Sequence, residues 1–92
     1  MRIRGEGGEV RAGARVAATL GPWTLERPPD RLSGGSWVLA AAVRQRDAFW
    51  SAHGGRFDLV LPAGSVAWIY RGVGVAWGEQ AVSIGIGKPE VS

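Results

Sequence analysis

Cysteine is absent from this sequence of 92 residues, and histidine occurs once. Without thiols the chain can form neither a disulfide nor a metal site built from cysteine and histidine. The single histidine, His53, follows Ser51 by two residues, but no third residue is indicated that would orient the pair for nucleophilic catalysis. The carboxylates do not fall in registers that would bring two of them together for acid–base chemistry. We therefore expect a protein that is not an enzyme, with no catalytic residues, no metal site and no cofactor.

Long apolar runs are missing as well. No segment approaches the length of about 20 residues that a membrane-spanning helix needs. The N-terminal sequence MRIRGEGGEV also lacks the apolar core of a secretion signal. We expect cytoplasmic synthesis without secretion and no association with a membrane.

A strong excess of positive charge is the third feature that the chain lacks. Lysine and arginine together number 11, against 8 aspartates and glutamates, for a net charge of +3. This charge is too small for the concentrated basic surface of a typical nucleic-acid-binding protein. All but one of the basic residues are arginine, which a GC-rich genome explains as easily as phosphate recognition does.

The chain does have alternating apolar residues, together with 15 glycines. This combination predicts an all-β fold, as a small barrel or sandwich of five to seven short antiparallel strands with a C-terminal meander. The length suits a single domain over residues 1–92, with a potential N-terminal arm at 1–8 and a short tail at 88–92.

Residues 73–86 predict a β-hairpin with one apolar face, because strand side chains repeat with period two. With an even number of residues in the connection, the opposed pairs are Trp77 with Val82, Val75 with Ile84, and Val73 with Ile86. On the other face, Gly72 would oppose Gly87 and Gly74 would oppose Gly85. Four glycines that face one way indicate that another backbone comes close. We leave two alternatives open: a bent barrel corner or covering helix of this chain, and a docking surface for a neighbouring subunit or an extended ligand.

A second hairpin precedes this one. Alternating apolar residues at 57–61 and 66–70 flank a loop at 62–65. The expected pairs are Leu61 with Val66, Leu59 with Trp68, and Phe57 with Tyr70. The inward parity changes after Tyr70, which predicts a bulge or corner at residues 71–72.

The earlier part of the chain is harder to interpret. Alternation over residues 10–20 predicts one half-buried strand, followed by a bend, a bulge or a new strand at Gly21-Pro22. Residues 37–43 are apolar on both parities, as in a strand that is covered on both sides. A helix is the alternative there, because Ser36 could cap it. No clean apolar stripe forms on a helical wheel, which favours the strand, with a short helix or helical turn near 44–53.

Two groups of side chains are candidates for contacts with a partner. Phe49 and Trp50 are adjacent, so on a strand they would point to opposite faces and one would be exposed. An exposed aromatic residue could anchor a partner protein, stack on a base or stack on a sugar, or it could fold back as a lid on the barrel. The second group consists of four arginines that could form a patch for nucleic acid or an acidic partner: Arg44, Arg46, Arg56 and Arg71. Acidic residues between them favour an ordinary solvated surface instead.

These features together predict a non-enzymatic structural or interaction module that assembles into a larger complex through the four glycines and the aromatic pair. The expected partner is another protein or further copies of the chain. Size and composition would suit a virion component, such as a phage-like head decoration or head–tail connector protein. The alternative is a small β-barrel that binds single-stranded nucleic acid through arginine and aromatic contacts.

Overall fold

The computed structural model describes residues 2–27, 36–52 and 55–92, and the described residues are mostly in β-strands. In chain order the elements are β1 (Arg2–Glu6), β2 (Glu9–Ala12), β3 (Arg15–Glu26), β4 (Trp37–Arg46), α1 (Ala48–Ala52), β5 (Arg56–Ala63), β6 (Val66–Gly74), β7 (Ala76–Trp77), β8 (Gln80–Ile86) and β9 (Glu90–Val91). The predicted all-β fold is confirmed. The strands outnumber the expected five to seven because β7 and β9, of two residues each, carry no alternation that a sequence could reveal.

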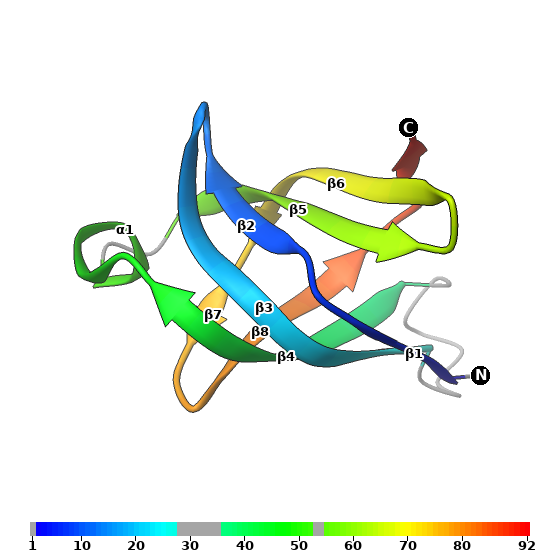
Figure 1. The fold of residues 1–92 in the computed structure, drawn as a ribbon. Helices are drawn as coiled ribbons and strands as arrows, with labels where there is room; N and C mark the ends of the chain where they lie inside the picture. The colour runs from blue at the N-terminus through cyan, green and yellow to red at the C-terminus, as the bar shows by residue number, and fades with distance from the viewer. Residues whose placement is uncertain (1, 28–35, 53–54) are drawn as a thin grey trace.

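All of these strands belong to one antiparallel sheet with the order β7-β8-β4-β3-β2-β5-β6-β9, and β1 pairs with β3 off this path. The sheet curls, so that β2, β5 and β6 form one layer and β3, β4 and β8 the other (Figure 1). Within the described ranges the series of paired strands starts at β7 and ends at β9, and the sheet is not closed into a barrel. At the open side the Ser83 hydroxyl on β8 donates a 2.6 Å hydrogen bond to the Gly74 carbonyl on β6.

The two layers are joined by β3, which is long enough to pair with β2 in its first half and with β1 in its second. Gly7 and Gly8 separate β1 from β2, and both have positive φ. A side chain at Gly8 would collide with the carbonyl oxygen of Val60 on β5. Glycine therefore allows the chain to turn away from β1 and to pair β2 with β5.

The prediction of a single strand over residues 10–20 is wrong, because the chain makes a tight hairpin inside this segment. Ala12 opposes Arg15, with Gly13 and Ala14 between them and Gly13 at a φ of 62°. A two-residue hairpin turn often takes glycine at this first position, because positive φ is costly for other residues. Of the three alternatives at Gly21-Pro22, the structure has the bulge and no new strand, because β3 is continuous and its register with β4 shifts at this point.

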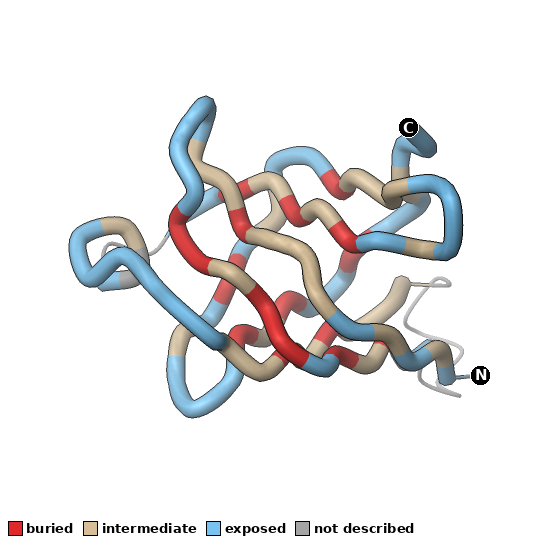
Figure 2. The backbone as a smooth tube through the Cα atoms, viewed as in Figure 1, coloured by how far each residue is buried: buried red, intermediate tan, exposed pale blue. Residues whose placement is uncertain are grey.

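The hydrophobic core lies between the layers, and the buried segments in Figure 2 face one another across it. Its largest buried aromatic side chain is Trp23, which is 3% exposed and lies against the backbone of Gly5 on the paired strand β1. The rings of Phe57 and Trp77 meet edge to face, with 5.7 Å between their centroids. Such aromatic contacts add to the stabilisation that buried area alone provides.

The predicted pairing of the C-terminal hairpin is wrong. β8 pairs with β4 over most of its length, whereas β7 contributes only two residues to its other side. Trp77 opposes Ala81 instead of Val82, so the connection between them has an odd number of residues. The alternation of residues 73–86 is real, but it does not reveal that β8 has β4 as its main partner.

A bulge at Gly85 explains why Ile84 and Ile86 do not point to the same side of the sheet, as the predicted hairpin required. Gly85 has a φ of 74°, and the register between β4 and β8 passes over it. Ile86 therefore returns to the core at 1% exposure, whereas Ile84 opposes Val38 on the outside of the sheet instead of Val75. Val73 opposes Phe57 of β5 and not Ile86.

The hairpin of β5 and β6 is confirmed, but its register is shifted by two residues. The turn is shorter than predicted, because Ala63 opposes Val66 and only Gly64 and Ser65 lie between them. The observed pairs in place of the predicted ones are Leu61 with Trp68, Leu59 with Tyr70, and Phe57 with Val73. The shift by two keeps every side chain on its predicted face. The bulge at residues 71–72 is confirmed, with Gly72 at a φ of 62°.

The strand over residues 37–43 and the helical turn near 44–53 are both confirmed, as β4 and α1. The helix begins after Asp47, whose Oδ1 accepts hydrogen bonds from the backbone N–H groups of Phe49 (2.9 Å) and Trp50 (3.2 Å). Asp47 is therefore the N-cap residue of α1. Across the described ranges, no helix is long and apolar enough to cross a membrane.

Candidate functional site

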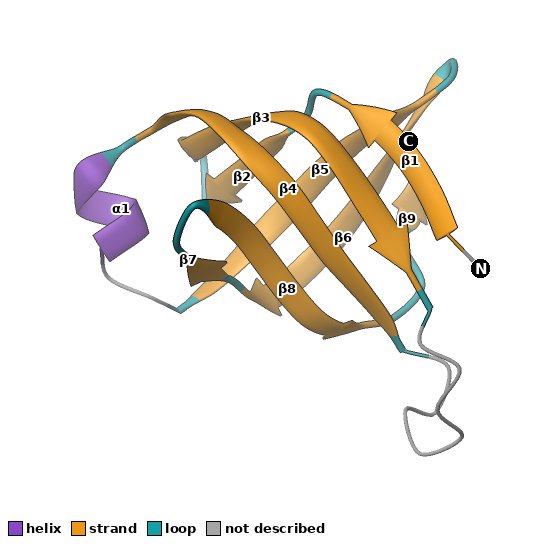
Figure 3. Cartoon of the chain, turned by 90° about the horizontal axis from the view of Figure 1, so that it is seen from below, coloured by secondary structure: helices purple, strands orange, loops and turns teal. Residues whose placement is uncertain are grey.

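The outer sides of β4 and β8 form a mostly apolar surface, which we call the β4–β8 face. Alternate residues of β4 and β8 point outward here, in directly opposed pairs: Val38 with Ile84, Ala40 with Val82, and Ala42 with Gln80. Ala76 of β7 adds a further exposed apolar residue opposite Val82. Figure 3 views the molecule from the side of β3, β4 and β8, where α1 lies beyond the end of β4 and not over the sheet.

Ile84 is the most prominent side chain of this face. It is 76% exposed, the highest value among the large hydrophobic residues that the structure describes as exposed. Its neighbours Val38 and Val82 are partly exposed as well. A single exposed isoleucine is ordinary, but a contiguous apolar surface around one is typical of an interaction site.

A shallow hollow of about 270 Å³ lies beside these residues on the same side of the sheet. Small side chains of β4 and β3 line it, among them Ala40, Ala42 and Thr24, and Arg4 and Gln80 line it as well. Because Ala40 opposes Val82 and Val38 opposes Ile84, the hollow is next to the protruding residues along β4. The β4–β8 face thus carries a protrusion and a depression side by side.

Charged residues border the β4–β8 face, and one of them, Arg4, also lines its hollow. On one margin Arg2 Nη2 lies 3.0 Å from Glu26 Oε2. On another, Arg44 pairs with Glu6. Interfaces between proteins commonly have such a polar rim around an apolar centre.

The sequence did not predict this face, although one of its features pointed to it. Residues 37–43 are apolar on both parities, and we expected a strand that is covered on both sides. In the structure one side of β4 faces the core, where Leu39 and Ala41 are buried. On its other side, Val38, Ala40 and Ala42 stay partly exposed.

The four glycines expected to form a docking surface do not oppose one another. Gly74 opposes Arg56 of β5, and Gly85 lies in the bulge of β8. No described atom lies within 4 Å of the position that a Cβ atom would take at Gly72, Gly74, Gly85 or Gly87. Within the described ranges no covering helix or strand therefore accounts for them. The positive φ values at Gly72 and Gly85 provide a conformational reason for two of the four.

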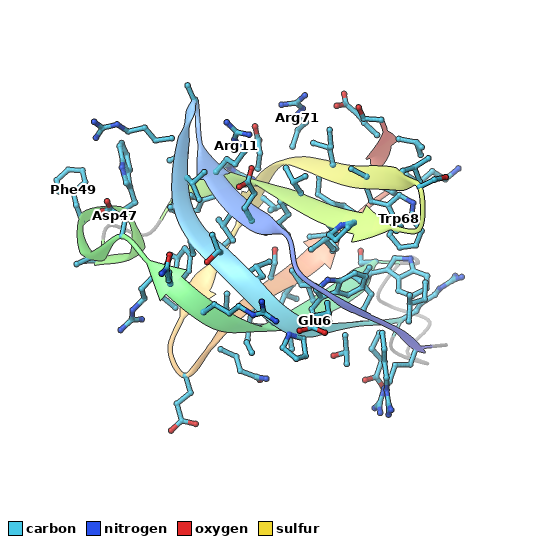
Figure 4. The ribbon with its side chains drawn as sticks, in the orientation of Figure 1. Glu6, Arg11, Asp47, Phe49, Trp68 and Arg71 are labelled. Carbon is cyan, nitrogen blue, oxygen red and sulfur yellow. The ribbon has the colours of Figure 1, made fainter. Side chains whose placement is uncertain are left out.

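The two aromatic residues of α1 differ in exposure, and one of them is exposed, as expected. Phe49 is 60% exposed at the end of the molecule formed by α1 (Figure 4). Trp50 is partly buried against the core and meets Phe49 edge to face, with 5.1 Å between ring centroids. Phe49 is therefore the accessible member of the pair.

The four arginines of the predicted patch do not form one group. Arg44 pairs with Glu6 on β1. Arg56 donates a 2.8 Å hydrogen bond to the Gly72 carbonyl. Arg71 lies on the other side of the molecule from Glu6 (Figure 4). Arg46 is exposed near α1, at the end of β4.

Arg71 belongs to a charged surface on the outside of β2, β5, β6 and β9, which we call the charged face. It consists of five charged residues around an opposed pair of partly exposed apolar residues, Val60 and Ile69; the charged residues are Glu9, Arg11, Asp58, Arg71 and Glu90. Arg71 Nε lies 2.9 Å from Glu90 Oε2, and Arg71 Nη1 lies 3.2 Å from Asp58 Oδ2. The hydrogen bond to Glu90, and to a lesser extent the one to Asp58, raises the pKa of the Arg71 guanidinium above its ordinary value.

A larger cavity of about 500 Å³, the end pocket, opens at the end of the molecule away from α1. Its lining includes three aromatic residues, a serine and two basic residues: Trp37, Trp68, Tyr70, Ser36, Arg27 and Lys88. Aliphatic residues complete the lining. Figure 4 shows Trp68 at this end. Tyr70 is 6% exposed, and its burial raises the pKa of its phenol.

Few reactive groups are brought together in the part of the chain that the structure describes. Those residues include no group of three or more His, Asp or Glu side chains that could hold a metal ion. His53 lies outside the described residues, so the expectation about this side chain is not tested. The expectation that the protein is not an enzyme stays a prediction.

Comparisons with known proteins add no further constraint. No protein-family model matches the chain, and neither a curated protein nor a solved structure matches it. The candidate site must therefore be judged on its geometry and chemistry alone.

Proposed function

We propose that this protein is a non-enzymatic assembly module whose copies associate through the β4–β8 face. The observation that carries the proposal is Ile84, which is 76% exposed within a surface of outward-facing apolar residues. Burying an exposed isoleucine side chain stabilises a complex by about 1.5–3 kcal/mol before the costs of association. A central residue of this kind is a typical hot spot.

A second copy of the chain fits this surface better than an unrelated partner does. A two-fold symmetric interface needs a surface that is complementary to itself. The protrusion around Ile84 and the hollow over Ala40 and Ala42 meet this need, because both lie on the same face. They are separated by about 7–13 Å along β4, since a strand rises roughly 3.3 Å per residue. Rotation about an axis between them would seat Ile84 of each copy in the hollow of the other.

The biological setting that we propose is a larger assembly with many copies of small subunits, such as a virion. A head decoration or head–tail connector protein would use a module of this size in this way. We also propose that the curled sheet resembles a small barrel with one open side. The Ser83–Gly74 hydrogen bond, which brings β6 close to β8 at that side, supports this. Adding a neighbouring copy beside this open seam would cover Gly74, where a Cβ would meet open space.

Nucleic-acid binding through the four arginines has less support. Arg44 and Arg71 are paired with carboxylates of this chain on different sides of the molecule. An arginine that already pairs with a carboxylate must lose that contact before it can neutralise a phosphate. Arg46 would remain the best residue on which to test this alternative, in a titration with oligonucleotides at two salt concentrations.

The test of self-assembly is the mass of the protein in solution as a function of its concentration, measured by light scattering and sedimentation. We expect the wild-type mass to rise above that of one chain, and Ile84→Asp to return it to one chain. Val91→Asp is the matched control, because Val91 is 66% exposed but lies on β9, away from the β4–β8 face. A wild-type protein that stays monomeric up to about 1 mM, where even a weak dimer would form, would contradict the proposal.

The predicted role of the glycines is tested by Gly74→Val in the same assay. Gly74 has no positive φ, and its Cβ position is open, so valine can be accommodated by the fold. Gly85 is unsuitable for this test, because valine at a φ of 74° would strain the backbone of β8. If the glycines contact a neighbouring copy, Gly74→Val will lower the mass of the assembly; an unchanged mass would remove them from the interface.

A further inference from the structure

The end pocket combines chemical groups that no part of the assembly proposal uses. Its volume of about 500 Å³ lies within the range of small-molecule sites. Trp37, Trp68 and Tyr70 line it, together with the aliphatic side chains of Ile3 and Leu25. An aromatic wall of this kind offers flat faces on which a planar ring can stack.

Tyr70 supplies a polar group to the lining of the pocket. It is 6% exposed and lines the pocket, and its hydroxyl forms no hydrogen bond with the described residues. Among the described residues, the fully buried polar side-chain atoms without a partner are Trp23 Nε1 and Trp77 Nε1, and the Tyr70 hydroxyl is not one of them. The hydroxyl is therefore accessible from the pocket, and a ligand there would form a hydrogen bond with it. The Ser36 hydroxyl in the same lining could form another.

The charge of the lining is positive. Arg27 and Lys88 are exposed residues at the pocket, and no acidic residue is among its described lining. Neither basic side chain forms an ion pair within the described ranges, in contrast to Arg2, Arg11, Arg44 and Arg71. The pocket therefore favours a ligand that carries a negative charge next to its ring.

We propose that the end pocket binds a nucleotide, with its base against the aromatic wall of Trp37 and Trp68 and its phosphate between Arg27 and Lys88. The Tyr70 hydroxyl would bond to the edge of the base. Base stacking on aromatic residues with cations for the phosphate is a recurrent way to hold nucleotides. None of these residues belongs to the β4–β8 face, so this proposal and the assembly proposal fail or succeed independently.

The first experiment is a titration of ¹⁵N-labelled protein with AMP, GMP, CMP and UMP, followed through the indole N–H signals. These signals are assigned by single Trp→Phe substitutions. We expect the Trp37 and Trp68 signals to shift with at least one nucleotide, whereas the Trp50 signal stays in place. Adenosine and ribose 5-phosphate each lack half of the ligand and should bind more weakly than AMP.

Variants then separate the roles of the lining. Arg27→Gln and Lys88→Gln should each weaken binding by about five-fold, as expected for the loss of a partly solvated charge pair. Tyr70→Phe keeps the ring and removes the hydroxyl, and it should weaken binding by about three-fold or more without lowering the thermal midpoint. Arg46→Gln is the matched control, an exposed arginine near α1, and should leave binding unchanged.

A parallel titration with a short single-stranded oligonucleotide distinguishes the two sources of such a ligand. Equal affinity per site for AMP and the oligonucleotide assigns the pocket to a free nucleotide, whereas much tighter binding of the oligonucleotide assigns it to one nucleotide of a strand. Either result upholds the site. The proposal is overturned if no nucleotide shifts Trp37 or Trp68, or if Arg27→Gln, Lys88→Gln and Tyr70→Phe all bind like the wild type.

Discussion

The two outer surfaces of the curled sheet differ sharply in how they meet solvent. On the charged face, Arg71 contacts both Asp58 and Glu90, and Arg11 contacts Glu9 at 3.0 Å. On the β4–β8 face, by contrast, the opposed pairs are Val38 with Ile84 and Ala40 with Val82. Both surfaces are outer sides of one antiparallel sheet with one core, so the fold itself does not require the difference.

This difference is the basis of our proposal that the β4–β8 face binds a partner. An antiparallel sheet can face water on one side when that side carries polar side chains. The charged face satisfies this condition, because its charges are matched by opposite charges on neighbouring strands. The β4–β8 face does not, and in a free monomer its apolar side chains would remain in water. We interpret the charged face as solvent-exposed in the assembly and the β4–β8 face as covered.

The largest expected effect comes from Gly8→Ala, which would disrupt the connection between the two layers that carry the charged face and the β4–β8 face. The new methyl group would collide with the Val60 carbonyl at a φ of 113°. We expect a loss of about 3 kcal/mol or more in the free energy of unfolding, measured by urea denaturation. Gly13→Ala is the matched control: it also has positive φ, but its Cβ position is open, so only about 1–2 kcal/mol of backbone strain is expected. Equal losses would show that Gly8 does not act through contact with β5.

Filling the hollow should weaken association with little effect on the fold. Ala40→Leu places a larger side chain where Ile84 of the second copy would sit. We expect self-association to weaken about 30-fold, which corresponds to roughly 2 kcal/mol, with the unfolding midpoint of the monomer nearly unchanged. Ala67→Leu is the control on the outer side of β6 and should not change association. Stronger association of Ala40→Leu would contradict the fit of Ile84 into the hollow.

Asp58→Ala should have the smallest effect of the three, and its effect should be confined to stability. Asp58 Oδ1 accepts a 3.0 Å hydrogen bond from the Gly72 backbone N–H at the bulge of β6. Its loss should lower the free energy of unfolding by about 1 kcal/mol. The mass of the assembly should stay the same, because Asp58 lies on the charged face. A change in mass with this variant would remove the distinction between the two faces.

The sequence was informative where a strand makes its contacts with the next segment of the chain. The β5–β6 hairpin, the bulge at residues 71–72 and the change from β4 to α1 all follow from local alternation and from capping by Asp47. Register was less predictable, because shortening the β5–β6 turn by two residues on its β5 side preserves every face and leaves no trace in the alternation.

The sequence was uninformative where distant strands compete for one partner. Residues 73–86 alternate as a hairpin would, and nothing local reveals that β4 pairs with β8 across the intervening β5 and β6. The bulge at Gly85 then reverses the parity, so Ile84, which was expected opposite Val75, is the most exposed large hydrophobic residue of the β4–β8 face. The candidate site was missed for this reason, although the apolar residues on both sides of β4 had signalled it.

The most direct test of the account is a comparison of methyl NMR spectra at high and low protein concentration. Self-association through the β4–β8 face predicts that the Ile84, Val38 and Val82 methyl signals shift on dilution, and that those of Ile69 and Val60 on the charged face do not. Shifts at Ile69 and Val60 with no change at Ile84 would contradict the account, and so would spectra that do not depend on concentration.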